Sequence, residues 1–169
     1  MLFRSILASE SDIMTTPDQR YSYYEFDPTD REELRYDIII GTSCFSDLLN
    51  DYYQDSTVTF DNLSSCGVKP CFLAFATKED DDRSALLQIR HELEDRLQNE
   101  ILGLKHSGAE TGIVIGGAIG TRTVYIDLLL YDGLSSIDRI KTLLSQYPHK
   151  FYLSDFLPNS ELIELFSPQ

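Results

Sequence analysis

The sequence CFLAFATKEDDDRSALLQIRHELEDRLQNEILGL fills residues 71–104, and the spacing of its apolar residues changes along the way. Residues 71–76 are an unbroken apolar run, which is typical of a buried strand. From Leu86 onward the apolar residues instead recur every three or four positions, which predicts a long amphipathic helix over 83–104. The acidic run 79–82 suits a helix start, because carboxylates accept hydrogen bonds from the free amides there.

After residue 104 the spacing of the apolar residues again changes between that of a strand and that of a helix. Residues 111–119 and 122–132 are rich in apolar and β-branched residues and predict two strands joined by a tight turn. A second amphipathic helix is expected from the Ser135–Ser136 pair to Pro148, and residues 150–156 predict a last strand. This order is that of the ferredoxin-like split βαβ unit. We therefore predict an α+β fold of the βαββαβ type, an antiparallel sheet with both helices on one face.

In this arrangement the first and third strands lie at the centre of the sheet, and the apolar stripes of strands and helices meet in one core. The predicted core residues are Leu93, Leu97, Ile126, Leu128, Ile140 and Leu144.

Outside this unit the patterns are weaker. We expect strands over 21–26, 35–40 and 57–60, a short helix over 45–53, and a helical turn over 158–166. No proline-rich linker or break in composition divides the chain, and its length suits one domain. We predict a single domain over 1–169, in which an N-terminal α+β extension, 1–67, packs on a ferredoxin-like core, 68–169.

The charge balance narrows the choice of partners. The 169 residues include 28 acidic and 14 basic side chains, a formal net charge of −14. Such a surface repels phosphate backbones and anionic lipids but accelerates encounter with a basic protein. We therefore expect a basic protein partner, no nucleic acid and no membrane. The simpler interpretation, that the charge only keeps the protein soluble, stays open.

Two features favour a cytoplasmic location. The apolar residues among the first eight are interrupted by Arg4, and that run is too short for a secretory leader or a membrane span. Cys44, Cys66 and Cys71 cannot all pair within one chain, which favours a reducing compartment.

The sequence predicts no catalytic residues, no metal and no cofactor. The cysteines and the three histidines lack the spacing of zinc ligands. Cys44 precedes an expected helix, whose first amides could lower a thiol pKa, but a buried or incidental cysteine is the simpler interpretation.

Gly116, Gly117 and Gly120 lie close together without forming a phosphate-loop motif. They are explained either by backbone fitting, that is, a β-bulge or another element passing close to a strand face that lacks side chains, or by a ligand site at exposed backbone amides. Asp127, on the next strand, would border such a site.

Tyrosines lie among carboxylates in two parts of the extension. Tyrosine anchors many interfaces, and nearby charges steer a partner toward them. The alternative is packing at an edge strand and at the rim of the core. The predicted partner-binding residues are Tyr23, Tyr24, Glu32, Glu33, Asp51, Tyr52 and Tyr53.

The run GGAIGTRTVYID at residues 116–127 is followed by an apolar strand, Tyr131-Asp132-Gly133 and an amphipathic helix. This pattern resembles the C-terminal half of small bacterial proteins of unknown function. Some of these are similar to the ferredoxin-like ribonuclease E inhibitor protein B, and acidic relatives resemble immunity proteins that neutralise secreted toxins. The resemblance covers roughly residues 68–156 and implies no catalytic residue.

Together these observations favour a non-catalytic protein-binding module, such as an inhibitor or immunity-type protein, that binds a basic partner. A first alternative is a regulatory domain that binds a small ligand, because split βαβ units often pair side by side, here as a homodimer. A second is an enzyme that uses one face of the sheet.

Overall fold

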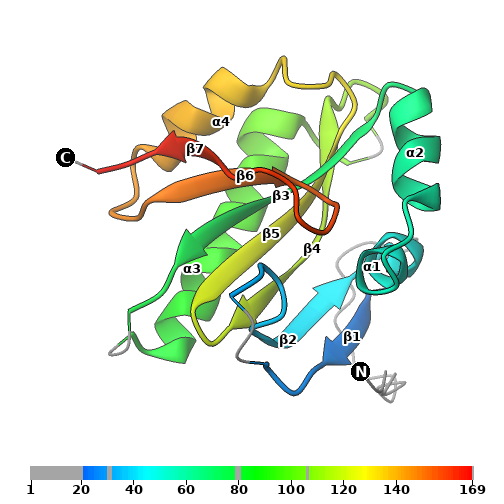
Figure 1. The fold of residues 1–169 in the computed structure, drawn as a ribbon. Coiled ribbons are helices and arrows are strands. Elements are labelled where there is room, and N and C mark those ends of the chain that lie inside the picture. Colours follow the sequence, from blue (N-terminus) through cyan, green and yellow to red (C-terminus); the bar gives the residue numbers. More distant parts are fainter. Residues whose placement is uncertain (1–20, 30–31, 79–80, 106, 169) are drawn as a thin grey trace.

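The computed structural model describes residues 21–29, 32–78, 81–105 and 107–168 (Figure 1). Seven strands form one antiparallel sheet in the order β1-β2-β4-β5-β3-β6-β7. The strands are β1 (Ser22–Glu25), β2 (Ile38–Ser43), β3 (Lys69–Ala76), β4 (Gly112–Gly120), β5 (Thr123–Leu130), β6 (Phe151–Asp155) and β7 (Ile163–Phe166). The helices are α1 (Ser46–Tyr53), α2 (Val58–Ser65), α3 (Arg83–Arg96), the π-helical segment η1 (Leu97–Leu102) and α4 (Ile137–Leu144).

Helices cover both faces of the sheet. Apolar residues of α3, η1 and α4 pack with β3, β5 and β6 in one buried cluster. A second cluster, rich in aromatic residues, lies on the opposite face beneath α1 (Figure 1). The prediction that the two later helices share a face is confirmed, while α1 adds a layer on the other face.

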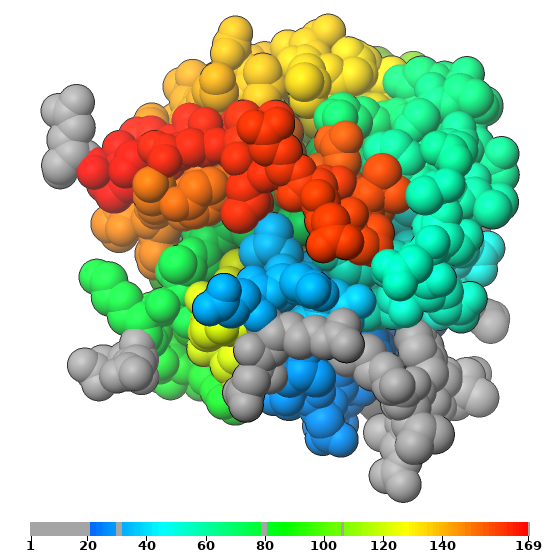
Figure 2. Space-filling view, viewed as in Figure 1, coloured from blue at the N-terminus to red at the C-terminus, as the bar shows by residue number. Residues whose placement is uncertain are grey.

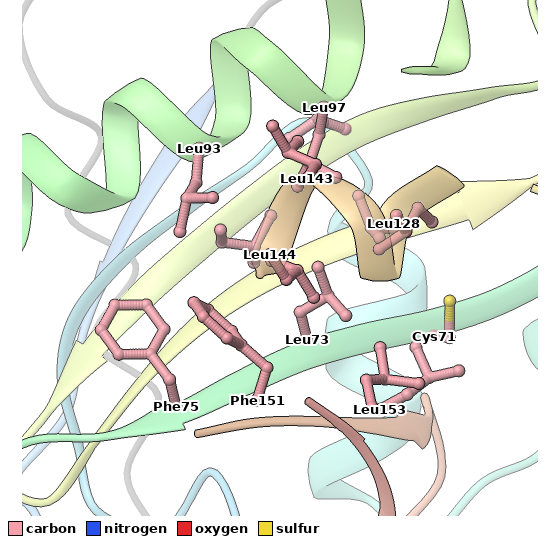
Figure 3. Packing of buried hydrophobic residues seen from close by; sticks show 14 of the residues in the cluster. Cys71, Leu73, Phe75, Leu93, Leu97, Leu128, Leu143, Leu144, Phe151 and Leu153 are labelled. Atoms are coloured by element: carbon pink, nitrogen blue, oxygen red, sulfur yellow. The ribbon is translucent and has the colours of Figure 1, made fainter. Parts of the chain in front are cut away.

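The predicted core is confirmed in full. All six predicted core residues are buried, and the strand predicted over 71–76, observed as β3, lies between β5 and β6. Figure 3 shows Leu93 and Leu97 pointing toward Leu143 and Leu144 of α4. The apolar spacing thus identified the buried face of each element correctly.

The long helix begins as expected and ends differently. The Asp82 carboxylate accepts a hydrogen bond from the Ser84 amide at 3.2 Å and caps α3. The last turn widens into η1, where the buried Gln98 side chain donates to the Gly103 carbonyl at 2.7 Å and accepts from the Val114 amide at 2.9 Å. This polar side chain therefore fastens the helix end to β4.

The sheet is larger than the four-stranded sheet predicted from the sequence. Strands β1 and β2 extend it beyond β4, and β7 extends it beyond β6, so the seven-strand order is not that of a ferredoxin-like sheet. The predicted extension and the predicted core thus share one sheet. Weak strand patterns near the chain ends find partners only at the edges of a sheet that already exists.

Three local predictions were wrong. Residues 57–60 begin α2 instead of a strand, because Phe60 and Leu63, three apart on a helix, pack together against the aromatic cluster. The 158–166 turn contains β7, which pairs with β6. The strand predicted over 35–40 starts only at Ile38, because a turn with Arg35 at φ 68° precedes it.

Candidate functional site

The turn before β2 buries an arginine completely. Arg35 is 0% exposed, and its guanidinium binds both Asp127 carboxylate oxygens, at 2.5 and 3.1 Å. Burial opposes the charge on Arg35, but the nearby Asp127 carboxylate outweighs it and keeps the Arg35 pKa well above its usual value. A bidentate pair of this kind holds both side chains in a fixed geometry.

Aromatic rings surround this guanidinium. Its Cζ atom lies 4.5 Å from the ring centre of Phe156, 5.1 Å from Phe72, 5.3 Å from Tyr125 and 5.6 Å from Tyr52. Cations are attracted to aromatic ring faces at such distances. Arg35 therefore sits in a cage that satisfies its charge through Asp127 and through the rings.

Two tyrosines of α1 hold the same turn by its backbone. Tyr52 donates its hydroxyl to the Leu34 carbonyl at 3.2 Å, and Tyr53 donates to the Arg35 carbonyl at 2.8 Å. Burial raises the pKa of Tyr52 to about 12 and that of Tyr53 further. Both hydroxyls therefore act as donors that fix the turn on the sheet.

A pocket of about 230 Å³ opens between this turn and the chain after β6. Glu33, Tyr36 and Tyr52 line one side, and Ser154 and residues 157–160 line the other. Figure 2 shows the two segments, blue and red-orange, side by side on one face of the molecule. Two rings, a carboxylate and a hydroxyl thus meet in a small recess.

The predicted tyrosine surface divides into exposed and buried members. Tyr23 is 41% exposed, and Glu32 and Glu33 are exposed. The prediction was wrong for Tyr24 and Tyr52, which are buried in the aromatic cluster and present no free surface to a partner. The reason is that Tyr24 and Tyr52 pack on the sheet face opposite α3, where apolar area is removed from water.

Tyr53 and Asp51 also have structural roles. Tyr53 is half-buried against Phe26, with ring centres 4.7 Å apart. The Asp51 carboxylate accepts a hydrogen bond from the Thr59 amide at 2.8 Å, and hydrogen bonds from Thr59 lower the Asp51 pKa. Asp51 therefore connects α1 to the start of α2.

The predicted glycine site is filled by protein atoms. A Cβ atom on Gly116 would lie 2.0 Å from the Thr42 carbonyl oxygen, and one on Gly120 would lie 2.2 Å from the Asp37 carboxylate. Gly117 lies beneath the α3 side chains. Of the two explanations, close passage of other elements fits the structure, and Asp127 is occupied by Arg35.

A second buried ion pair lies on the α3 side of the sheet. Arg90 of α3 is buried, and its Nε lies 3.0 Å from the Glu94 Oε1. Burial raises the Glu94 pKa to about 7, although Arg90 opposes the shift. Nearby, Lys105 donates to the Tyr21 hydroxyl at 3.0 Å.

The cysteines show no sign of activation. Cys44 is half-buried, Cys66 is exposed, Cys71 is buried, and no disulfide joins them. Burial raises the pKa of Cys44, which disfavours the reactive thiolate. Within the described part of the chain, no group of three or more histidine, cysteine or acidic side chains is placed to hold a metal ion.

The sequence analysis did not identify Arg35 and Arg90 as members of buried ion pairs. A signal existed for the first: Asp127 is the single charge within the apolar strand β5, and a lone charge in a buried strand requires a partner. The sequence could not name that partner, because Arg35 lies 92 residues away.

Comparisons with protein-family models, with curated proteins and with solved structures found no match to this chain. Among the described residues, no helix has both the length and the apolar character needed to cross a membrane.

Proposed function

We propose that this protein is a non-catalytic binding module that attaches to a basic protein through its acidic face. We define the acidic face as the exposed surface of residues 32–36 and 46–65, that is, the turn before β2, the helices α1 and α2, and the short connection between these helices. Figure 2 views the molecule from this side, with the turn in blue and the two helices in cyan and teal.

The observation that carries this proposal is that the aspartates of the acidic face have no basic side chains close to them in the sequence. Residues 36–68 contain five aspartates and no lysine, arginine or histidine. Among them Asp47, Asp55 and Asp61 are exposed, and no basic side chain in the described residues forms an ion pair with them. Such a surface attracts a basic partner over roughly a Debye length, about 8 Å at physiological ionic strength.

Helix α2 adds apolar contact area to this charge. None of its side chains is buried, and Val58 in its first turn is 64% exposed between Asp55 and Asp61. An apolar residue with charges on either side is a common arrangement at interfaces, where the apolar part provides affinity and the charges provide a fast association rate.

An inhibitor or immunity-type role agrees with this surface, because a basic toxin or nuclease would be neutralised by an acidic cover. We also propose that β3, α3, β4, β5, α4 and β6 form a split βαβ unit extended at both edges. The neighbouring order β4-β5-β3-β6 inside the larger sheet supports this proposal. A cytoplasmic, bacterial setting goes with it.

The test removes charge from the acidic face without disturbing the fold. In the triple variant Asp47→Asn, Asp55→Asn, Asp61→Asn, the asparagine at 61 can still accept from Thr57, and the one at 55 tolerates its φ of 53°. The matched control removes three charges from α3 and α4: Glu92→Gln, Asp95→Asn and Asp138→Asn. Each form is immobilised and exposed to host lysate at low and high salt.

A partner of this face is recognised by three results together. It is a basic protein, it is retained by the wild type and the control but lost from the triple variant, and salt lowers its association rate. Proteins that bind all three forms equally, at every salt concentration, would contradict the proposal. A bound metabolite, detected by native mass spectrometry, would instead favour the small-ligand alternative.

A further inference from the structure

The geometry points to the outer edge of β1 as the place where an extended, basic segment of the partner adds to the sheet as a further strand. This inference rests on the proposed function and names how the basic partner is held. The edge lies near the acidic face, because Phe26, which follows β1, packs in one buried cluster with Leu48 and Leu49 of α1. Figure 1 shows β1 as the last strand of the sheet on this side.

Two residues of β1 direct their backbone groups away from the sheet. β1 pairs with β2 in continuous register, and just beyond β1 the Phe26 amide donates to the Ile39 carbonyl at 3.0 Å. In an antiparallel pair, residues that hydrogen-bond to the partner strand alternate with residues whose N–H and C=O point outward. The backbone of Tyr24 therefore faces β2, as that of Phe26 does. Tyr23 and Glu25 face outward, and among the described residues no other strand pairs with them there.

The side chains of these two residues indicate what the added strand carries. Tyr23 is 41% exposed and Glu25 is exposed, and neither side chain forms a hydrogen bond or an ion pair with the described part of the chain. Two positions apart on a strand, they share one face of the sheet. Directly opposite residues of neighbouring strands interact, and aromatic with β-branched side chains or opposite charges are favourable pairs. The added segment therefore presents an apolar side chain to Tyr23 and a lysine or arginine to Glu25.

The other edge of the sheet, β7, is less suited to an added strand. Its register with β6 shifts between Phe151 and Tyr152, and its carboxylate Glu164 is already bound to Lys150 at 2.7 Å. Bulges at an edge are one means by which proteins prevent further strands from pairing. The register of β1 has no such shift. A partner strand therefore finds a regular, unshifted edge at β1.

Charge decides between a basic segment and a second copy of this chain as the occupant. Glu25 is exposed at the edge, and Asp27, two residues later, is exposed as well. Two copies joined at β1 would bring these carboxylates together, and each chain has a net charge of −14. Like charges across neighbouring strands are destabilising, whereas lysine or arginine side chains would neutralise them.

The experiment is a titration of the full-length protein with the peptide acetyl-Val-Thr-Lys-Thr-Val-Thr-Lys amide, followed by NMR. The extended peptide places valine and lysine on one face, at the two-residue spacing of Tyr23 and Glu25. We expect saturable shifts at the amides of residues 22–26, with an affinity of about millimolar, as for a short peptide alone. Hydrogen exchange at the Tyr23 and Glu25 amides should become slower. The analogue with glutamate in place of lysine should bind about tenfold more weakly.

A second analogue separates strand addition from simple attraction of charge. N-methylation of the valine and lysine amides keeps the charge but removes the N–H donors that an added strand needs, so the saturable shifts should be lost. In the protein, Tyr23→Ala and Glu25→Gln should each weaken the peptide about twofold to fivefold, as expected for one cross-strand pair. Glu161→Gln is the control, because it removes an exposed carboxylate near the opposite edge. Unchanged amide spectra away from β1 would show that each variant is folded.

Equal binding of the N-methylated peptide, shifts centred outside β1, or no shift at the solubility limit would overturn the inference. Slow exchange of both amides in the free protein would also overturn it, since a second copy or the chain's own residues 1–20 would then cover the edge. These results would leave the proposed function standing if the triple aspartate variant still lost its basic partner. Conversely, salt-independent capture would contradict the proposed function without altering the peptide titration, so the two failures are distinguishable.

Discussion

Replacing Asp127 with asparagine should destabilise the protein severely, because it leaves the Arg35 charge buried and uncompensated. Arg35 is 0% and Asp127 is 1% exposed, so water cannot reach the cation when the carboxylate is lost. Breaking a buried ion pair from one side typically costs about 3–5 kcal/mol. Asparagine has nearly the same shape as aspartate, so the loss would not come from a cavity. Whole domains are stable by only about 5–15 kcal/mol.

The assay is urea unfolding followed by circular dichroism, with the change in midpoint converted through a common slope. The control is Glu164→Gln, which breaks the exposed Lys150–Glu164 pair, 43% and 48% exposed and 2.7 Å apart. An exposed pair contributes at most about 1 kcal/mol. A loss below about 1 kcal/mol for Asp127→Asn as well would refute the argument that burial decides the difference.

A double variant tests the same reasoning in the other direction. Asp127→Leu alone should be strongly destabilising, and adding Arg35→Met should restore part of the stability, because no unpaired buried charge is left. If the second substitution lowers stability further, the cost lies in lost packing around the cage and not in the stranded charge.

Three further predictions use other parts of the fold. Leu97→Ala, at a fully buried side chain between the sheet and α4, should cost about 2–5 kcal/mol in urea unfolding, and a loss below about 1 kcal/mol would contradict its place in the core. Burial raises the Glu94 pKa from its usual 4.5 to about 7, so the unfolding free energy of the wild type relative to Glu94→Gln should fall as pH rises from about 4.5 to 7; a flat or rising difference would exclude this shift. Gly116→Ala should destabilise more than Gly67→Ala, because both glycines have positive φ but only at Gly116 would the new Cβ meet backbone, 2.0 Å away; equal melting temperatures would count against this account.

Much of the central sheet and of one core follows from local patterns. The apolar run at 71–76 predicted a buried strand, and the three-to-four spacing after Leu86 predicted the inner side of the helix. Each of these patterns lies within a single helix or strand. The period of that helix or strand alone decides which of its side chains face the core. This is why the predicted core needed no correction.

The conformation of the segments at and near the edges of the sheet depends on neighbours that are distant in sequence, and local sequence patterns do not identify these neighbours. Residues 57–60 alternate like a strand but form the start of α2, and Ile163–Phe166 becomes β7 because β6 offers a free edge. Short segments have weak intrinsic preferences, so the neighbour that completes their hydrogen bonds or covers their apolar side chains decides their conformation.

For the charged and aromatic residues, too, some properties follow from the sequence and others only from the tertiary structure. The sequence by itself determined the net charge of −14 and the absence of basic residues from 36 to 68, since both are counts. Only the tertiary structure decided that Tyr52 is inside, that Arg35 meets Asp127, and that Glu33 and Ser154 share a pocket. Residues far apart in the chain meet only when the sheet forms, and a charge or ring has its function only in the surroundings that the sheet provides.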